Sequence, residues 1–172
     1  GGLDIDAFHS ISAIDNEYGY ITVGQTKSYM LDKSRVKNPG FFGRIIASIF
    51  KKKPTSEVWI INIDEYGDKN WHNTYGGKKE DVGKSIKQSG AGGYIITSET
   101  SSKGAGKNDI WVIKVDKNGK IKWDITIGDK KDEFASSTTV SNRQEIFISG
   151  YKTKKEKFSL RKLIKPNKNI EK

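Results

Sequence analysis

Few side chains of this sequence could act as a nucleophile, a general base or a metal ligand. The chain has two histidines, His9 and His72, and no cysteine. Asp6, His9 and Ser10 lie close together, and these residue types could form a Ser-His-Asp triad. Neighbouring residues of a strand point to opposite faces, so we do not expect the three side chains to converge. The histidines also lack the spacing of metal ligands. We therefore predict no catalytic residue, no metal site and no cofactor, and we do not expect this chain to be an enzyme.

Two short segments share part of the pattern of a ligand-binding loop. "DKNGK", residues 116–120, begins like a calcium loop but lacks the third oxygen ligand and the distal Glu. We expect Asp116, and Asp64 at the matching position, to cap turns by accepting bonds from the following backbone amides. "SSKGAGKND", residues 101–109, contains G-x-G-K without the strand, helix and Ser/Thr of a phosphate loop. We interpret it as a flexible loop between strands, with Lys103 and Lys107 as candidate partner-binding residues.

The elements that carry these residues are repeated along the chain. "EVWIINIDEYGDKNW", residues 57–71, and "DIWVIKVDKNGKIKW", residues 109–123, are 52 residues apart, and the same offset links the second unit to a third. A regular repeat of this kind indicates one supersecondary unit used several times. The offset relates the predicted structural residues in pairs: Trp59 to Trp111, Asp64 to Asp116, Gly67 to Gly119 and Trp71 to Trp123.

Each unit has the pattern of four short strands. In "IKWDITI", residues 121–127, apolar and polar side chains alternate with the period of a half-buried strand. Asn118 and Gly119 predict a tight hairpin turn, because both residues tolerate positive φ. We expect the tryptophans to fill the contacts between sheets. We also expect the acidic residues that recur at the start of each unit to form hydrogen bonds between units: Asp6, Asp81 and Asp132 or Glu133.

The predicted fold class is all-β, with three four-stranded antiparallel meanders arranged as β-propeller blades. We expect a single partial propeller over residues 1–172. Blade 1 spans about 3–77 and includes an insert at 27–56, blade 2 spans about 78–129, and an incomplete blade 3 spans about 130–166. Propellers close with about 4–8 blades. Either further blades lie in a longer parent protein, or chains associate to complete the ring, or the sheets stack without forming a propeller.

The strand "GGYIITSET", residues 92–100, and the Asp-x-Trp-Val-x-Lys-Val-Asp-x-x-Gly-x-x-x-Trp pattern of residues 109–123 resemble a family of bacterial and archaeal propeller repeats. The closing half is also similar to quinoprotein-like propellers, and the repeats resemble kelch-like blades. The resemblance covers about 120 residues and omits the insert and the C-terminal tail. It implies the propeller fold and, because many such proteins are secreted or lie at the cell surface, an extracytoplasmic location. It implies little about function.

The insert has its own apolar pattern in "PGFFGRIIASIFKKKP", residues 39–54. Apolar pairs recur every four residues, which predicts a short amphipathic helix with lysines at its C-terminal end. We expect this helix to cover the propeller, with docking to another protein or peripheral membrane contact through residues 41–53 as alternatives. The candidate partner-binding residues are Phe41, Phe42, Ile45, Ile49, Phe50, Lys51, Lys52 and Lys53.

The formal net charge of +10 is concentrated outside the repeats. Residues 27–56 carry eight basic side chains against one acidic, and residues 152–172 carry nine against two. One aromatic residue, Phe158, accompanies the basic tail, whereas single-stranded nucleic acids are usually bound by several stacking aromatic side chains. Nucleic acid is therefore not the favoured partner.

The leading functional hypothesis is a non-catalytic interaction scaffold. It would bind a protein or a glycan through the loops of a propeller face and through the insert. Self-association that completes the propeller is a further expected interaction. The alternatives are a fragment of a larger quinoprotein-like or hydrolase propeller with its active site in other blades, and a module that binds polyanions or a membrane surface.

Overall fold

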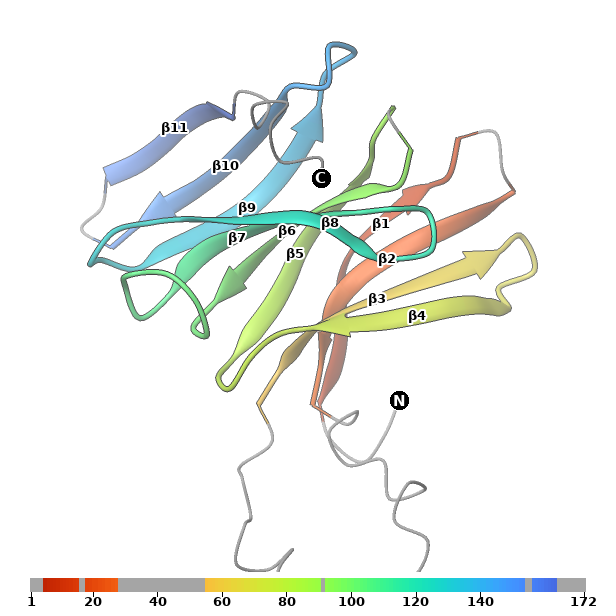
Figure 1. Cartoon of the computed structure of the whole chain (residues 1–172), viewed down its shortest axis with the longest axis horizontal. Helices are drawn as coiled ribbons and strands as arrows, with labels where there is room; N and C mark the ends of the chain where they lie inside the picture. The colour runs from red at the N-terminus through yellow and green to blue at the C-terminus, as the bar shows by residue number, and fades with distance from the viewer. Residues whose placement is uncertain (1–4, 16–17, 28–54, 91, 154–155, 164–172) are drawn as a thin grey trace, which may run out of the picture.

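The computed structural model describes residues 5–15, 18–27, 55–90, 92–153 and the backbone of 156–163. These residues form strands and turns, and none of the described segments is helical. The insert, with the helix predicted there and its candidate partner-binding residues, lies outside the described residues. Figure 1 shows three twisted antiparallel sheets that follow one another along the chain.

Each sheet is a meander in which strands pair in their order along the chain. Sheet A contains β1 (Asp6–Ala13), β2 (Gly19–Thr26), β3 (Glu57–Asp64) and β4 (Lys69–Tyr75). Sheet B contains β5 (Asp81–Gln88), β6 (Tyr94–Thr100), β7 (Asp109–Val115) and β8 (Ile121–Ile127). Sheet C contains β9 (Glu133–Val140), β10 (Ile146–Lys152) and β11 (Glu156–Leu163). The all-β class and the blade-like meanders predicted from the repeat are confirmed.

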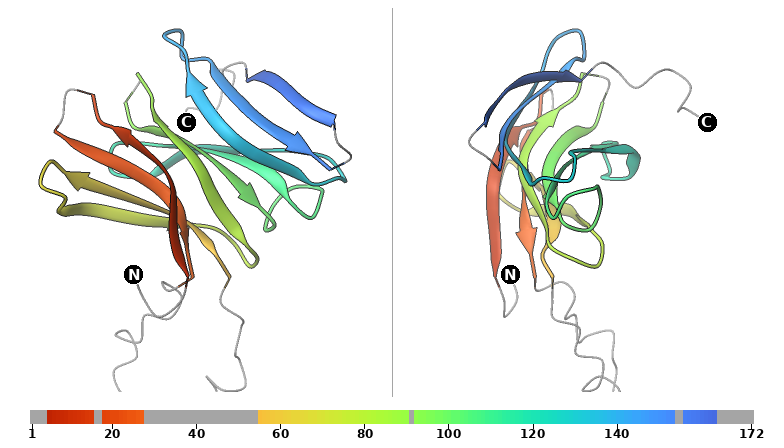
Figure 2. Two further views of the ribbon diagram at one scale, coloured as in Figure 1. Left: turned by 180° about the vertical axis from the view of Figure 1, so that it is seen from behind. Right: turned by 90° about the vertical axis from the view of Figure 1, so that its left-hand side faces the viewer.

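The first strand of every sheet carries the same irregularity. Its pairing register shifts by one residue at His9 in β1, at Lys84 in β5 and at Ser136 in β9. Such a bulge bends a strand and increases its twist. Because the bulge falls at the same repeat position three times, the sheets are equivalent in backbone geometry as well as in sequence. Seen from behind, β1, β5 and β9 lie one after another across the molecule (Figure 2).

The turns between the third and fourth strands confirm the predicted capping. Oδ1 of Asp64 accepts bonds from the backbone N–H groups of Tyr66 and Asp68, each at 2.9 Å. Oδ1 of Asp116 accepts the equivalent bonds from Asn118 and Lys120, at 3.0 and 2.9 Å. Only the glycine of each turn has positive φ, +89° at Gly67 and +78° at Gly119. Asn118 does not adopt the positive φ that it tolerates, because the carboxylate cap stabilises an ordinary turn that needs a single left-handed residue at its end.

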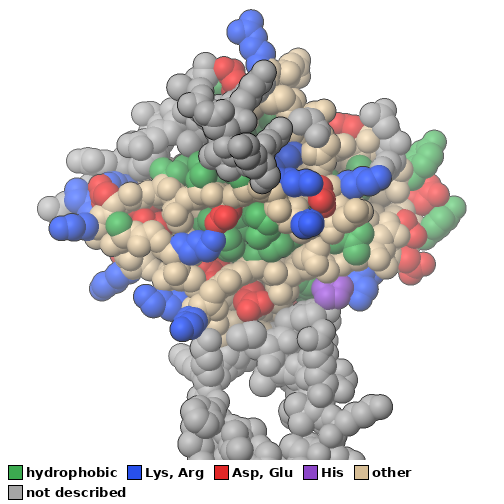
Figure 3. Space-filling view, in the orientation of Figure 1, with side chains coloured by type: hydrophobic (Ala, Val, Ile, Leu, Met, Phe, Trp, Pro, Cys, Tyr) green, Lys and Arg blue, Asp and Glu red, His purple; other side chains and the backbone are tan. Residues whose placement is uncertain are grey.

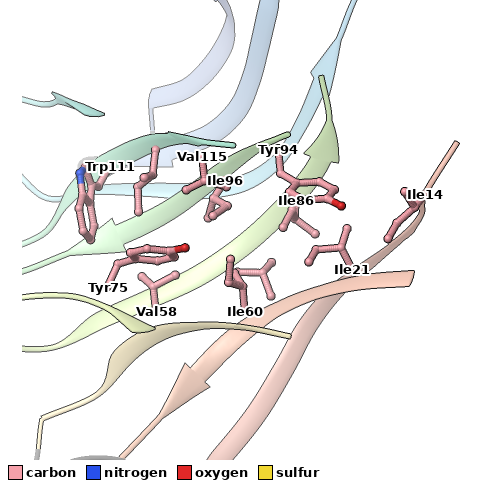
Figure 4. Close-up of a cluster of buried hydrophobic side chains, with 12 residues drawn as sticks. Ile14, Ile21, Val58, Ile60, Tyr75, Ile86, Tyr94, Ile96, Trp111 and Val115 are labelled. Carbon is pink, nitrogen blue, oxygen red and sulfur yellow. The ribbon is translucent and has the colours of Figure 1, made fainter. Parts of the chain in front are cut away.

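Two apolar cores hold the three sheets together. We call the side of a sheet that faces the next sheet along the chain its front face, and the other side its back face. The front face of sheet A, with Ile21, Val58 and Ile60, packs against the back face of sheet B, where Trp111 and Ile86 are fully buried (Figure 4). The front face of sheet B packs in the same way against the back face of sheet C, and this second core contains Ile95, Ile110, Val112, Ala135, Ile146 and Ile148.

The predicted role of the tryptophans in sheet packing is confirmed for both repeat positions. Trp111 and Trp71 belong to the core between sheets A and B, and Trp123 packs against the core between sheets B and C. Trp59 lies on the back face of sheet A, where no described sheet covers it. Instead the ring of Phe8 stacks on it, with 4.8 Å between ring centroids and 27° between planes.

Candidate functional site

The three residues that could have formed a catalytic triad contact three different partners. Nδ1 of His9 lies 2.8 Å from the carbonyl oxygen of Gly83, a hydrogen bond between sheets A and B. The hydroxyl of Ser10 accepts a hydrogen bond from the backbone N–H of Ile86 at 3.4 Å. Oδ1 of Asp6 accepts one from the hydroxyl of Thr26 at 2.6 Å. The side chains are held apart by the strand geometry that predicted their separation.

The other histidine, His72, lies half-buried in β4 of sheet A. Burial lowers the pKa of its imidazole, and the nearby Lys69 ammonium lowers it further. Among the described residues no group of three or more His, Asp and Glu side chains is placed to hold a metal ion.

The recurring acidic residues form a clasp at the start of each sheet. Asp6 pairs with Thr26 in the strand register, Asp81 pairs with Thr100, and Glu133 pairs with Lys152. Each clasp therefore joins the first two strands of one sheet. Two of these carboxylates also make the bonds between units that we expected: Oδ2 of Asp81 accepts from the N–H of Gly77 at 2.8 Å, and Oε2 of Glu133 accepts from the N–H of Asp129 at 3.2 Å.

The backbone N–H groups of the same residues add further bonds between units. The N–H of Asp81 donates to the carbonyl oxygen of Ser56 at 2.9 Å, and that of Glu133 donates to Asn108 at 2.8 Å. The carboxylate of Asp132 also reaches the neighbouring unit, as described next.

The glycine-rich loop after β6 already holds carboxylates where a phosphate would bind. The N–H groups of Ala105 and Gly106 donate to the two carboxylate oxygens of Asp109, at 3.3 and 3.0 Å. The N–H groups of Lys107 and Asn108 both donate to Oδ1 of Asp132 at 3.1 Å. Four consecutive amides are thus committed to fixed anions from sheets B and C. The loop is tied down by these bonds, in contrast to the flexible loop expected from its composition, and it has no phosphate-binding geometry.

Of the two candidate partner-binding lysines in this loop, Lys103 is held within the chain. Its ammonium forms an ion pair with Asp124 and lies 4.3 Å from the ring centroid of Trp111. Burial raises the pKa of Asp124, but hydrogen bonds from Lys103 and the indole N–H of Trp111 outweigh it and hold the pKa below its usual range. Lys107 is exposed and stays a candidate for contact with a partner.

Sequence reasoning missed a different surface, at the outer end of sheet A. Tyr18 precedes β2 and Tyr66 lies in the turn between β3 and β4, and their side chains are 86% and 83% exposed. The pairing of Gly19 with Asp64 brings the two turns side by side. We call this surface the tyrosine tip and include in it the exposed acidic residues of the same turns: Asp15, Glu65 and Asp68.

Figure 3 shows acidic and hydrophobic side chains gathered at this right-hand end of the molecule, over the β1–β2 and β3–β4 turns. The equivalent end of sheet B has Gly90 and Gly92 in one turn, and Lys117, Asn118 and Lys120 in the other. The two sheet ends have equivalent strand pairing but differ in aromatic content and in charge. The signal in the sequence was the pair of turn tyrosines, which lie 48 residues apart and become neighbours only through strand pairing.

No helix in the described segments is long and apolar enough to cross a membrane. No protein-family model matches the chain, and a search of curated proteins found no similar sequence.

Proposed function

We propose that the protein is a non-catalytic interaction scaffold and that the tyrosine tip is its contact surface for a partner protein. The observation that carries the proposal is the pair of exposed tyrosines, Tyr18 and Tyr66, which strand pairing brings to the same end of sheet A. By contrast, aromatic side chains such as Trp111 and Tyr94 are buried between sheets A and B.

Exposed tyrosines on a fixed backbone suit recognition. A tyrosine offers a large apolar ring and a hydroxyl, and it loses little conformational entropy on binding. Tyrosine is also enriched among the residues that dominate binding energy at interfaces. The exposed residues Asp15, Glu65 and Asp68 lie in the same turns as the two tyrosines, so we expect the partner to present basic side chains near its own apolar contact.

The insert and the basic tail also belong to the interaction hypothesis, but they lie largely outside the described residues. Their candidate roles, including peripheral membrane contact through residues 41–53, stay sequence predictions. The same applies to an active site in further blades of a longer parent.

The test compares two matched variants on a peptide array rich in Lys and Arg and on a glycan array. In the first variant Tyr18→Ala and Tyr66→Ala remove both rings of the tip. In the control, Asn118→Ala changes the position of sheet B that is equivalent to Tyr66. We expect peptide binding to weaken at least about tenfold in the tip variant, as for a hot spot, and to stay unchanged in the control.

If the chain binds glycans and no peptide on the arrays, its partner is a sugar and not a protein. Binding that survives the loss of both tyrosines would remove the tip from the proposal.

A further inference from the structure

Two sheet faces in this chain have no described sheet packed against them. They are the back face of sheet A and the front face of sheet C. The same two kinds of face meet at both junctions inside the chain, where the front of one sheet packs on the back of the next. The residues on the two open faces can therefore be compared position by position with those of two existing interfaces.

The open back face of sheet A has the apolar residues of an interface. Phe8, Ile11 and Tyr20 are 48%, 58% and 44% exposed. At the equivalent positions of sheet B, Ile86 is fully buried and Tyr94 is 3% exposed, both against sheet A. Large exposed apolar side chains that gather on one face indicate an interaction surface.

The size of one residue pair at each junction indicates what fits this face. At the first junction Gly83 lies against Val23, and a methyl group on Gly83 would come within 2.3 Å of Cγ2 of Val23. The equivalent pair at the second junction is Ala135 and Thr97, both of them buried. The back-face residue grows from Gly to Ala as the front-face residue shrinks from Val to Thr.

The two open faces continue this series. The back-face position of sheet A is Phe8, the largest of the three, and the front-face position of sheet C is Ser149, the smallest of its three. A close-packed interface needs constant total volume at a contact. Phe8 would clash with a valine in the position of Val23, but it can be accommodated over a serine.

A polar contact repeats beside this pair. The hydroxyl of Ser10 accepts a bond from the N–H of Ile86, and the hydroxyl of Ser85 accepts one from the N–H of Thr138 at 3.1 Å. The next serine in the series is Ser137, which lies exposed on β9. The N–H group equivalent to those of Ile86 and Thr138 is that of Ile11, on the open face of sheet A.

We propose that two copies of this chain pack head to tail, with the back face of sheet A of each copy on the front face of sheet C of the other. Phe8 packs over Ser149, and Ser137 accepts a hydrogen bond from the N–H of Ile11, at both contacts. The front face of sheet C also presents Tyr151, which is stacked on Phe134 with 4.7 Å between ring centroids. Two copies bring six sheets together, within the range of about 4–8 blades in closed propellers.

This inference is independent of the proposed binding function, because Tyr18 and Tyr66 belong to turns and not to the packed faces. Its test uses the absence of cysteine from the chain. Phe8→Cys and Ser149→Cys are made in separate proteins, mixed in equal amounts and oxidised. We expect the mixed disulfide to form faster than either symmetric one. A Phe8→Cys disulfide with itself, or no preference for the mixed product, would overturn the head-to-tail arrangement.

Solution mass gives a second readout on the unmodified chain. Sedimentation equilibrium is expected to show a dimer, and Ser149→Arg, a change on the face of sheet C, is expected to shift it to monomer while the circular dichroism spectrum is retained. Tyr66→Arg, in a turn outside both faces, should leave the dimer intact. A wild-type chain that stays monomeric at its highest soluble concentration contradicts the proposal, as does a Ser149→Arg variant that remains dimeric.

Discussion

The junction between sheets A and B has the same polar contacts as the junction between sheets B and C. The two junctions differ in the side chains that pack beside these contacts. In both, a serine in the first strand of one sheet accepts a hydrogen bond from a backbone N–H of the first strand of the next sheet, and that next strand begins with an acidic residue. At the first junction Ile86 packs in hydrocarbon, whereas at the second the equivalent Thr138 bonds the hydroxyl of Thr97 in a buried pair.

The clasps differ in the same sense. Asp81 is held by hydroxyl groups of Thr100 and Ser102 and by the N–H of Gly77. Glu133 is buried, and Oε1 lies 2.9 Å from the ammonium of Lys152. The clasp of sheet C therefore contains an ion pair where the clasp of sheet B uses neutral donors. The repeat keeps the geometry of the serine hydrogen bonds. The packed side chains and the clasps differ, and we expect them to set how each part of the molecule responds to mutation, salt and pH.

The largest effect is expected from emptying the apolar junction. Ile86→Ala removes a fully buried side chain between sheets A and B and should lower the free energy of unfolding by about 3 kcal/mol, the usual cost of such a cavity. Ile11→Ala changes the same repeat position on the open face and should alter it by less than about 0.5 kcal/mol. Denaturant unfolding at low protein concentration, where copies do not associate, compares the two. Equal losses of unfolding free energy in the two variants would mean that the back faces of sheets A and B are in the same environment.

A smaller effect is expected at the outer edge of the same junction. The hydroxyl of Tyr75 donates to the carbonyl oxygen of Gly119 at 2.6 Å, and the equivalent residue of sheet B is Ile127, which has no donor. Burial raises the pKa of Tyr75, so the hydroxyl stays protonated and donates at neutral pH. Tyr75→Phe should cost about 1 kcal/mol, because the buried carbonyl loses its partner.

The matched control is Tyr18→Phe, which removes an exposed hydroxyl and should leave the unfolding midpoint unchanged. If Tyr75→Phe also has no effect, the docking of the Gly119 turn on sheet A does not depend on this bond.

Exchanging the clasps should give a small net change. Glu133→Asp together with Lys152→Thr places the pair of sheet B in sheet C. Lys152→Thr alone leaves a buried carboxylate without its cation, which is costly. We expect the double variant to melt closer to the wild type than this single variant and to show less dependence of melting temperature on salt. A double variant that is no more stable than the single one would show that the two clasps are not interchangeable.

The smallest effect is expected in the response of two lysines to alkaline pH. Burial lowers the pKa of Lys114, whose ammonium bonds the carbonyl oxygen of Gly92, to about 8. From about pH 8 to the ordinary value of 10.5 the unfolded chain binds more protons, so this lysine makes stability rise with pH. Lys114→Met should flatten that rise in denaturant unfolding followed from neutral to alkaline pH.

Lys152 should respond in the opposite direction. Hydrogen bonds to Asp129 and then to Glu133 raise the pKa of Lys152 above its ordinary value of 10.5. The contribution of Lys152 to stability is complete below pH 10.5 and is lost as the pH rises through the raised pKa. Lys152→Thr should remove the decline in stability above this pH. A Lys152→Thr variant with an unchanged alkaline limb would place the decline elsewhere.

The sequence alone determined the repeated part of the protein. The 52-residue offset, the strand pattern and the Asp-Gly turns predicted three meanders, the capping by Asp64 and Asp116, and tryptophans between sheets. These features depend on side-chain alternation and on bonds within a few residues, so a local pattern is enough to specify them. The missing helix and Ser/Thr after G-x-G-K also argued against a phosphate loop at residues 101–109, although sequence reasoning missed the carboxylates that hold the loop.

Only the tertiary structure decided which residues meet across distant strands. Tyr18 and Tyr66 share one tip because Gly19 pairs with Asp64, and Phe8 covers Trp59 because sheet A has no sheet behind it among the described residues. The acidic residues that start sheets B and C also contact the second strand of their own sheet, and sequence reasoning, which placed their bonds between units, missed that contact. In each case the partner is chosen by register and by the packing of one sheet on the next, and neither is written in the spacing of a single segment.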